Sequence, residues 1–329
     1  MKHHLATILK GNDLTQKEAF EVMDCMARGE AGEAETAAFL IALAMKGETI
    51  DEVAGMVRAM RGQMISIDVG YDTLDTCGTG GDGAGTINVS TIAAFVCAAA
   101  GVKVAKHGNR SVSSKCGSFD VLEKVGVKID LGPDEVKKCL DQTGIACLFA
   151  PNFHPAMKRV APVRRALGIR TVFNFMGPLL NPVRATHQLI GVSSREMAEK
   201  LGSILMKLGS KRVILVNGDD GLDEISIAAP TQVYEFVQGK EKKEYAVEPE
   251  KKFELAEVRG GDIDENARIM KDVLSGKGTE AQNEFAAMNA GMALLAADAV
   301  RSFEEGEEKA RDILKSGAGR KKLEQLIAK

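Results

Sequence analysis

The sequence lacks the cysteine spacing of a zinc site and the paired arrangement of a disulfide framework. It contains six cysteines and no C-x-x-C pair: Cys25, Cys77, Cys97, Cys116, Cys139 and Cys147. This pattern argues against both kinds of site and favours a reducing cytoplasm. Cys77 and Cys116 fall in polar loops, where we interpret them as small residues at packed positions.

Other absences narrow the class of protein further. The longest apolar run, residues 92–102, is too short for a bilayer span, and no signal-peptide pattern precedes the first predicted helix. The net charge of -3 argues against nucleic acid or an anionic membrane as the main partner. There is no internal repeat, no low-complexity tract and no visible triad with a nucleophilic serine or cysteine. With 329 residues, 45% of them hydrophobic, the chain is predicted to fold as about two globular domains.

What the sequence does contain is concentrated in residues 75–123. Three polar, glycine-rich loops alternate there with two apolar runs, the pattern of strand, loop, helix, strand and loop. In open α/β sheets, loops that leave the carboxyl ends of strands converge on one crevice. We therefore expect these loops to form a single site.

The chemistry of the loops favours a strongly anionic ligand. The first loop has glycines that let backbone N–H groups turn toward one point: Gly78, Gly80, Gly81 and Gly83. The next helix is expected to begin beside polar side chains, where its positive dipole end also lies: Asn88, Ser90 and Thr91. The second loop adds cationic or potentially cationic donors: Lys106, His107 and Arg110. Glycine loops are often plain turns and N-x-S-T is often a helix cap, so the signal is the combination.

The motifs GTGGD, NVST and KHGNRSVSS, followed by GSFDVLE, closely resemble those of anthranilate phosphoribosyltransferases. The related pyrimidine nucleoside phosphorylases share a glycine-rich first loop, but their second loop follows a K-x-S-G-R-G type pattern. The resemblance covers nearly the whole chain. It implies an α/β fold, with a small N-terminal helical domain and a larger α/β domain whose central sheet is mostly parallel and flanked by helices.

The resemblance also implies a reaction: the amine of anthranilate displaces pyrophosphate from phosphoribosyl pyrophosphate (PRPP), in tryptophan biosynthesis. Lys106 and His107 are the predicted catalytic residues. The residues expected around PRPP are Gly78, Gly81, Asp82, Thr86, Asn88, Val89, Ser90, Thr91, Lys106, His107, Gly108, Asn109, Arg110, Ser111, Val112, Ser113, Ser114 and Ser118.

A buried strand over residues 212–218 delivers four acidic residues to the same edge: Asp219, Asp220, Asp223 and Glu224. Magnesium takes oxygen ligands and bridges to phosphates, so strand-end carboxylates suit it. We interpret the first two as solvated turn residues. The resemblance implies that Asp223 and Glu224, together with Ser90, bind Mg²⁺, with two ions per subunit.

Five prolines break residues 150–182 into short pieces, which suggests a crossing between domains. The segment matches a further family pattern whose first arginine is Arg164, and a guanidinium suits a planar carboxylate. The resemblance implies that Gly78, Asn109 and Arg164 hold anthranilate, with His154 as a weaker candidate for the pocket wall. Arg165 is interpreted as solvated.

The predicted domains are residues 1–69, helical and rejoined by part of 160–186, and residues 70–329, which bind PRPP. Capping boxes begin helices at Thr15 and Thr49. Residues 33–46 are predicted to form a helix that turns Ala37, Ala38, Leu40, Ile41 and Ala44 inward. The surplus of Met and Ala on the helical faces favours a subunit interface, and the resemblance implies a homodimer through this domain.

In the larger domain we expect a short strand over residues 127–129, an edge hairpin over 231–247, helices up to residue 314 and a short tail.

Three alternative functions remain open at the level of sequence. They are a nucleoside phosphorylase, a non-catalytic nucleic-acid-binding relative and a structural helical scaffold. The second loop and the Arg164 segment disfavour the first, the acidic net charge disfavours the second, and the acidic pair beside three anion-seeking loops disfavours the third.

Overall fold

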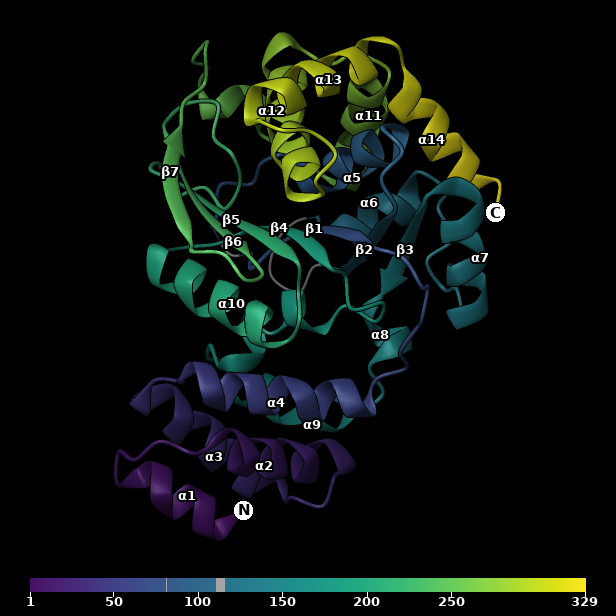
Figure 1. Cartoon of the computed structure of the whole chain (residues 1–329). Helices are drawn as coiled ribbons and strands as arrows, with labels where there is room; N and C mark the ends of the chain where they lie inside the picture. Colours follow the sequence, from purple (N-terminus) through teal and green to yellow (C-terminus); the bar gives the residue numbers. More distant parts are fainter. Residues whose placement is uncertain (81, 111–115) are drawn as a thin grey trace.

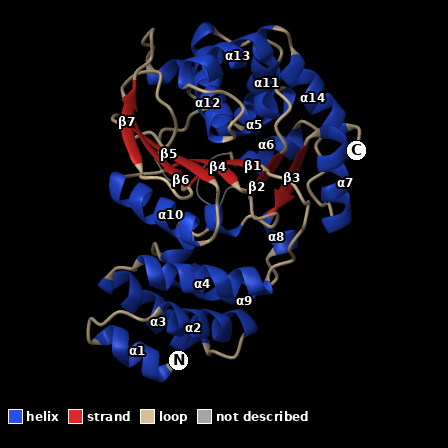
Figure 2. Ribbon diagram, viewed as in Figure 1, coloured by secondary structure: helices blue, strands red, loops and turns tan. Residues whose placement is uncertain are grey.

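The structure is a computed structural model, and it describes residues 1–80, 82–110 and 116–329. Its centre is a seven-stranded sheet in the order β3-β2-β1-β4-β5-β6-β7 (Figure 2). The strands are β1 (Leu74–Gly78), β2 (Val104–Gly108), β3 (Ile145–Phe149), β4 (His187–Gly191), β5 (Arg212–Gly218), β6 (Thr231–Val237) and β7 (Lys243–Val247). The first five run parallel, and β6 and β7 form the antiparallel edge hairpin that the sequence predicts.

Both faces of the sheet are covered, which explains the unbroken apolar character of the central strands. In β5, Ile214 and Val216 join one core while Val213 and Leu215 join the other, as the two-residue period of a strand requires. The first core includes residues of seven helices, six of them drawn above the sheet in Figure 1 and α7 at its right-hand side next to β3: α5 (Val89–Ala99), α6 (Ser118–Lys124), α7 (Pro133–Thr143), α11 (Ile263–Leu274), α12 (Glu280–Ala296), α13 (Phe303–Lys315) and α14 (Ala318–Ile327).

The second core joins the other face of the sheet to a bundle of helices. α10 (Arg195–Lys207) packs on β5 and β6 and also contacts the bundle helix α4. The bundle contains α1 (Lys2–Leu9), α2 (Gln16–Arg28), α3 (Glu33–Lys46), α4 (Ile50–Gln63) and, from the middle of the chain, α9 (Met157–Leu167). Figure 1 shows it as a separate layer below α10.

Local sequence signals explain where the bundle helices begin. Thr15 and Thr49 each form the expected capping box, with Glu18 and Glu52 as reciprocal partners. The crossing segment consists of short pieces, as its prolines predict: α8 (Ala150–Phe153), α9, and the 3-10 turns η1 (Val172–Asn174) and η2 (Gly177–Leu180). Another 3-10 turn, η3 (Leu255–Val258), precedes α11.

Three details of the predicted fold are wrong. Residues 127–129 form no strand, although Val127 and Ile129 are buried. The supposed tail contains α14, whose Leu323 and Leu326 pack into the core. In α3 the residues turned inward are Phe39, Leu40 and Leu43, and the face with Ala37, Ala38, Ile41 and Ala44 is half-buried or exposed. When apolar residues lie on nearly every side of a helix, as in α3, the hydrophobic periodicity does not identify the buried face.

Candidate active site

The loops that leave the carboxyl ends of β1, β2 and β5 meet at one edge of the sheet. In the first loop Gly80, Gly83 and Gly85 have φ angles of 70°, 72° and 64°, values that only glycine adopts readily. Beyond it, Thr86 forms a β-bridge with Arg259, which ties the loop to the chain before α11. The expected PRPP residue Gly81 lies outside the described residues.

Helix α5 begins at this edge with polar atoms that lack partners. Asn88 is its N-cap residue but makes no side-chain cap bond, and Val89 opens the helix. Within the described part of the chain, Asn88 Oδ1 and Thr91 Oγ1 are buried without a hydrogen-bond partner. The Ser90 carbonyl accepts from Thr76 Oγ1 at 2.8 Å. The N–H groups of Val89 and Thr91 already donate to the carbonyls of Ile87 and Asn88. Buried polar groups are normally satisfied, so the two orphaned oxygens fit a ligand that offers both an anionic group, to accept from the Thr91 hydroxyl, and a hydroxyl, to donate to the Asn88 oxygen.

Lys106 lies within β2, just before the second loop, and its side chain reaches the neighbouring strand β1. The Lys106 side chain is 2% exposed, and its Nζ donates to the Thr76 carbonyl at 2.6 Å. Gly108 lies so close to Phe119 that an added Cβ would come within 2.8 Å of the ring. A buried ammonium with one neutral partner is costly unless negative charge lies nearby, and that charge is supplied by β1 and by the chain after β5.

The remaining residues of this loop are placed less directly. Arg110 pairs with Glu123 at 3.0 Å and stacks 5.0 Å from the Phe149 ring centroid, rather than reaching into the crevice. Ser118 is the first residue of α6. The expected PRPP residues Ser111, Val112, Ser113 and Ser114 lie outside the described residues.

Asp223 and Glu224 follow β5, and their surroundings disfavour the ionised form of both carboxyls. Asp223 Oδ2 accepts from the Gly80 N–H at 2.9 Å. Burial, then the neighbouring Asp82 carboxylate, raises the pKa of Asp223 to about 7. Burial and then Asp223 raise the pKa of Glu224 well above its usual range, although Lys106 opposes that rise. A carboxylate pair of this kind favours a divalent cation, which removes the like-charge repulsion.

The donor set suits a metal that keeps other ligands. Among the described residues, no group of three or more His, Cys, Asp or Glu side chains is arranged to hold an ion alone. Magnesium commonly takes one or two carboxylates and completes its shell with water and substrate phosphates, so two carboxylates beside an anion-binding loop fit it. The sequence interpretation of Asp219 and Asp220 is consistent with their bonds, since both accept from residues of their own turn or of β6.

Asp75, which the sequence analysis did not single out, is a fully buried carboxyl of β1. It accepts from the His107 N–H at 3.2 Å and from Asn181 Nδ2 at 2.8 Å, and Asn181 also donates to the Ala105 carbonyl. Burial raises the pKa of Asp75 to about 6, against the opposing field of Lys106. The sequence feature that could have identified Asp75 is an acidic residue within an apolar strand. A buried carboxyl needs hydrogen-bond partners, so such a residue indicates a polar contact in the core.

His107 is paired with His154, the weaker of the candidates for the pocket wall. Its Nε2 lies 3.1 Å from Nε2 of His154, and the ring centroids are 5.1 Å apart. Burial, together with the proximity of His154, lowers the pKa of His107 to about 3, and burial lowers that of His154 to about 4. Both rings are therefore neutral near pH 7, so His107, which the sequence offered as a potentially cationic donor, faces the site as an uncharged ring.

The expected acceptor residues line one cavity of about 260 Å³. Gly78 and Asn109 reach it from the ends of β1 and β2, and Arg164 reaches it from α9. The Arg164 guanidinium stacks 5.3 Å from the Phe173 ring centroid, and burial lowers its pKa. The other walls include His107, His154, Met176 and Pro178. A cavity that combines apolar side chains with a few polar groups and an arginine suits a small aromatic carboxylate.

Comparison with known families gives matches to both parts of the chain. Residues 70–320 match the model of the glycosyl transferase family, α/β domain. Residues 2–64 match that of the glycosyl transferase family, helical bundle domain.

Curated relatives and solved structures agree with these matches. The chain is 48% identical over 331 residues to an anthranilate phosphoribosyltransferase of Symbiobacterium thermophilum, covering 99% of this chain and 96% of the relative. It is similar to the crystal structure of the Thermus thermophilus enzyme of that name, with a TM-score of 0.92, 40% identity and 98% coverage of both chains. It also resembles the Saccharomyces cerevisiae enzyme in complex with PRPP and Mg, with a TM-score of 0.88, 28% identity and coverage of 100% and 98%.

Proposed function

Because this chain belongs to the glycosyl transferase family that joins a helical bundle domain to an α/β domain, we infer that it is an anthranilate phosphoribosyltransferase. It transfers the 5-phosphoribosyl group of PRPP to the amine of anthranilate and releases pyrophosphate. The observation that carries this inference is the cavity in which Gly78 and Asn109, from two loop-bearing strands, face Arg164 from the bundle.

The donor site is proposed along the loops after β1 and β2. Gly78, Gly81, Asp82, Thr86 and the start of α5 surround one side of PRPP, and Lys106 through Ser114, with Ser118, surround the other. The orphaned Asn88 and Thr91 oxygens support this placement, because a hydroxylated, phosphorylated ligand supplies the missing partners. Lys106 stabilises the negative charge that develops as pyrophosphate leaves, and its burial strengthens that effect. His107 lines the boundary between donor and acceptor as a neutral ring.

The metal proposed for this site is Mg²⁺, with two ions per subunit, held by Asp223, Glu224 and the Ser90 hydroxyl. When bound, it neutralises phosphate charge and relieves the repulsion between the two carboxylates. The complex of the Saccharomyces cerevisiae relative with PRPP and Mg supports the choice of metal.

The acceptor is proposed to bind with its carboxylate on Arg164 and its ring among the apolar walls of the cavity. Arg164 orients the amine toward the donor loops, and a neutral aryl amine needs little activation, so most of the acceleration comes from alignment. A yeast relative whose structure contains 4-fluoroanthranilate is similar to this chain, with a TM-score of 0.87.

We also propose the predicted division into residues 1–69 and 70–329, a homodimer through the helical domain and a cytoplasmic location. The bundle residues Leu9 and Met45 are apolar yet 69% and 83% exposed, which supports the dimer. Within the described part of the chain Cys25, Cys77, Cys97, Cys139 and Cys147 form no disulfide, as a reducing compartment favours. No helix in the described part of the chain is long and apolar enough to cross a membrane.

The test is the decay of anthranilate fluorescence after addition of PRPP and Mg²⁺. Arg164→Ala should raise the KM for anthranilate far more than the KM for PRPP, because the lost contact is to the acceptor carboxylate; equal changes would contradict the assignment. Arg165→Ala, one residue along α9 and exposed, is the matched control. Phosphorolysis of thymidine or uridine in place of this reaction would favour the nucleoside phosphorylase alternative.

A further inference from the structure

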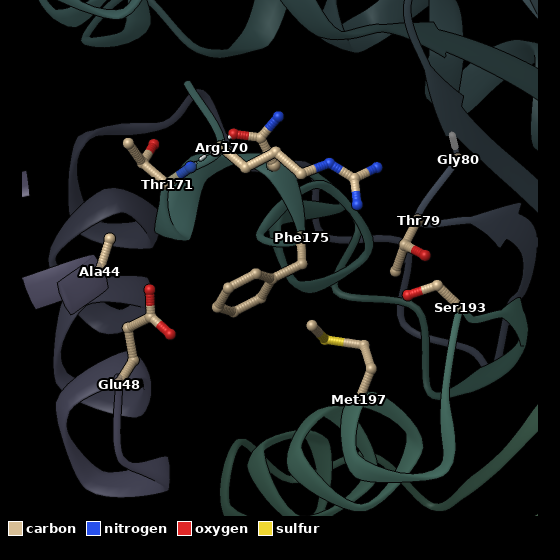
Figure 3. Close-up of a pocket in the computed structure, with 10 residues that line it drawn as sticks. Ala44, Glu48, Thr79, Gly80, Arg170, Thr171, Phe175, Ser193 and Met197 are labelled. Carbon is tan, nitrogen blue, oxygen red and sulfur yellow. Dashed lines mark hydrogen bonds between the residues drawn. The ribbon is translucent and has the colours of Figure 1, made fainter. Parts of the chain in front are cut away.

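A second cavity, of about 230 Å³, lies between the bundle and the α/β domain and shares no lining residue with the acceptor cavity. Its walls come from α3, the chain after β1, the crossing segment and α10, as Figure 3 shows. Nothing in the proposed reaction uses this space. Cavities at the junction of two domains are common ligand sites.

The cavity has polar groups at two ends and an apolar middle (Figure 3). At one end the Arg170 side chain extends toward Thr79 and Ser193. Phe175 and Met197 form the middle, and Glu48, two residues after the end of α3, lies at the other end. The buried hydroxyls of Thr79 and Thr171, another lining residue, have no hydrogen-bond partner among the described residues. An unsatisfied buried hydroxyl costs free energy that a ligand or water recovers.

The charged side chains around the cavity indicate which charge a ligand would carry. Glu48 Oε2 lies 3.5 Å from Lys200 Nζ, so its charge is already balanced. Arg170 is exposed at the mouth of the cavity and forms no ion pair with any described residue, so its guanidinium is open to an anionic group that enters from solvent. A guanidinium flanked by hydroxyls binds a carboxylate in bidentate fashion. Glu48 can still accept a hydrogen bond from a donor at the far end of the same molecule.

We propose that this second cavity binds a small aromatic carboxylate with a hydrogen-bond donor at the opposite end of its ring. The carboxylate pairs with Arg170, the ring packs on Phe175 and Met197, and the distal donor bonds to Glu48. The acceptor of the proposed reaction carries its amine beside its carboxylate, so the two cavities differ in the geometry of the molecule they accept. The site adjoins the proposed metal carboxylates, because Gly80, which also lines it, donates to Asp223 at 2.9 Å.

The experiment is titration calorimetry of the full-length protein with 4-aminobenzoate, whose two groups lie at opposite ends of one ring. A ligand of this kind, with about ten non-hydrogen atoms, is expected to bind with a Kd on the order of 0.1–1 mM. Benzoate, which lacks the distal donor, should bind about ten-fold more weakly, the effect of one hydrogen bond to a charged group. This comparison needs no variant. Equal affinity for both compounds, or no binding of 4-aminobenzoate at about ten times that Kd, would overturn the proposal.

Variants separate this cavity from the acceptor cavity. Arg170→Ala and Glu48→Gln should each weaken 4-aminobenzoate binding by about ten-fold or more, whereas Arg164→Ala and the exposed control Arg165→Ala should leave it unchanged. Loss of binding in Arg164→Ala with retention in Arg170→Ala would place the compound in the acceptor cavity and refute the second site. The measurement is independent of turnover, so its failure and a failure of the proposed reaction are distinguishable.

Discussion

Replacing Asp223 by Asn should stabilise the metal-free protein at alkaline pH. Burial and Asp82 raise the pKa of Asp223 from an ordinary 3.8 to about 7. The folded state therefore holds a proton that the unfolded chain releases between these values, so the folded state loses stability as pH rises from about 4 to about 7 and then stays level. Asn keeps an acceptor for the Gly80 N–H but carries no charge, so the variant escapes this loss.

The magnitude follows from the size of the shift. A rise of about three units corresponds to about 4 kcal/mol at most, and relaxation around a coupled pair of carboxylates leaves an expected gain of about 2 kcal/mol at pH 8. For a chain of this length the entropy of unfolding makes that gain roughly 3 °C in Tm. At pH 5 the unfolded carboxyl has already ionised, so about a third of this difference should remain, and it should disappear only below about pH 4.

The assay is thermal unfolding of wild type and Asp223→Asn at pH 5 and pH 8, with EDTA and then with Mg²⁺ and pyrophosphate. Mg²⁺ with pyrophosphate should raise the Tm of wild type at pH 8 and raise that of the variant much less, because the variant has lost a proposed ligand. Asp219→Asn, in the solvated part of the same turn, is the control. A Tm difference that is negative at pH 8, or independent of pH, would refute the reasoning.

Further expectations concern the histidine pair, Asp75, a glycine pair and a helix cap. Because the pKa values of His107 and His154 are lowered to about 3 and 4, stability should be full above pH 6.5 and fall between about pH 6.5 and 4; His154→Gln should make that fall shallower in acid denaturation followed by circular dichroism. Asn181→Ala removes the donor to Asp75 and should cost about 1–3 kcal/mol in urea unfolding, whereas a cost below about 0.5 kcal/mol would contradict the role given to this bond. Gly191→Ala should prevent folding, since its Cβ would lie 1.5 Å from the Asp223 carbonyl oxygen, while Gly62→Ala in α4 meets nothing within 4 Å and should stabilise by up to about 1 kcal/mol; expression yield and Tm report both. Thr15→Ala should cost about 1 kcal/mol by loss of the cap to Glu18, measured by the same unfolding assay.

The sequence predicted the loop-bearing strands well because their signals are local. Glycines with positive φ, a buried apolar strand and an acidic pair just after it each constrain a few neighbouring residues. The parallel order of β2, β1, β4 and β5 then places the strand ends at one edge, which is a general property of such sheets. The meeting of Arg164 with Gly78 and Asn109 came from family resemblance, because nothing local links α9 to two distant strands.

What the sequence did not predict depends on partners far away in the chain. Asp75 is acceptable in a buried strand only because Asn181 and the His107 N–H lie beside it, and neither partner is near it in sequence. The lowered pKa of His107 requires the burial that packing against His154 provides. The inward face of α3 was misassigned for a related reason, since Phe39 and Leu43 fill space that the other bundle helices leave. In each case the tertiary neighbours decide, and periodicity cannot supply them.

The edge of the sheet holds buried polar and charged groups whose burial costs free energy in the absence of a ligand. One kind of ligand would stabilise all of them. Among the described residues, the buried Lys106 ammonium donates to the Thr76 carbonyl, and Asn88 and Thr91 have buried oxygens without partners. Burial, followed by Asp82 for Asp223 and by Asp223 for Glu224, raises the pKa values of these two carboxyls. A neutral ligand would relieve none of the charge, and a lone anion would relieve Lys106 while opposing the carboxylates. A polyanion that arrives with divalent cations satisfies both sets together, which is why binding of either alone should be weak and binding of the two should be cooperative. Titration of pyrophosphate with and without Mg²⁺ measures that coupling directly, and affinities that are independent of the metal would show that the carboxylates and the anion loops do not act as one site.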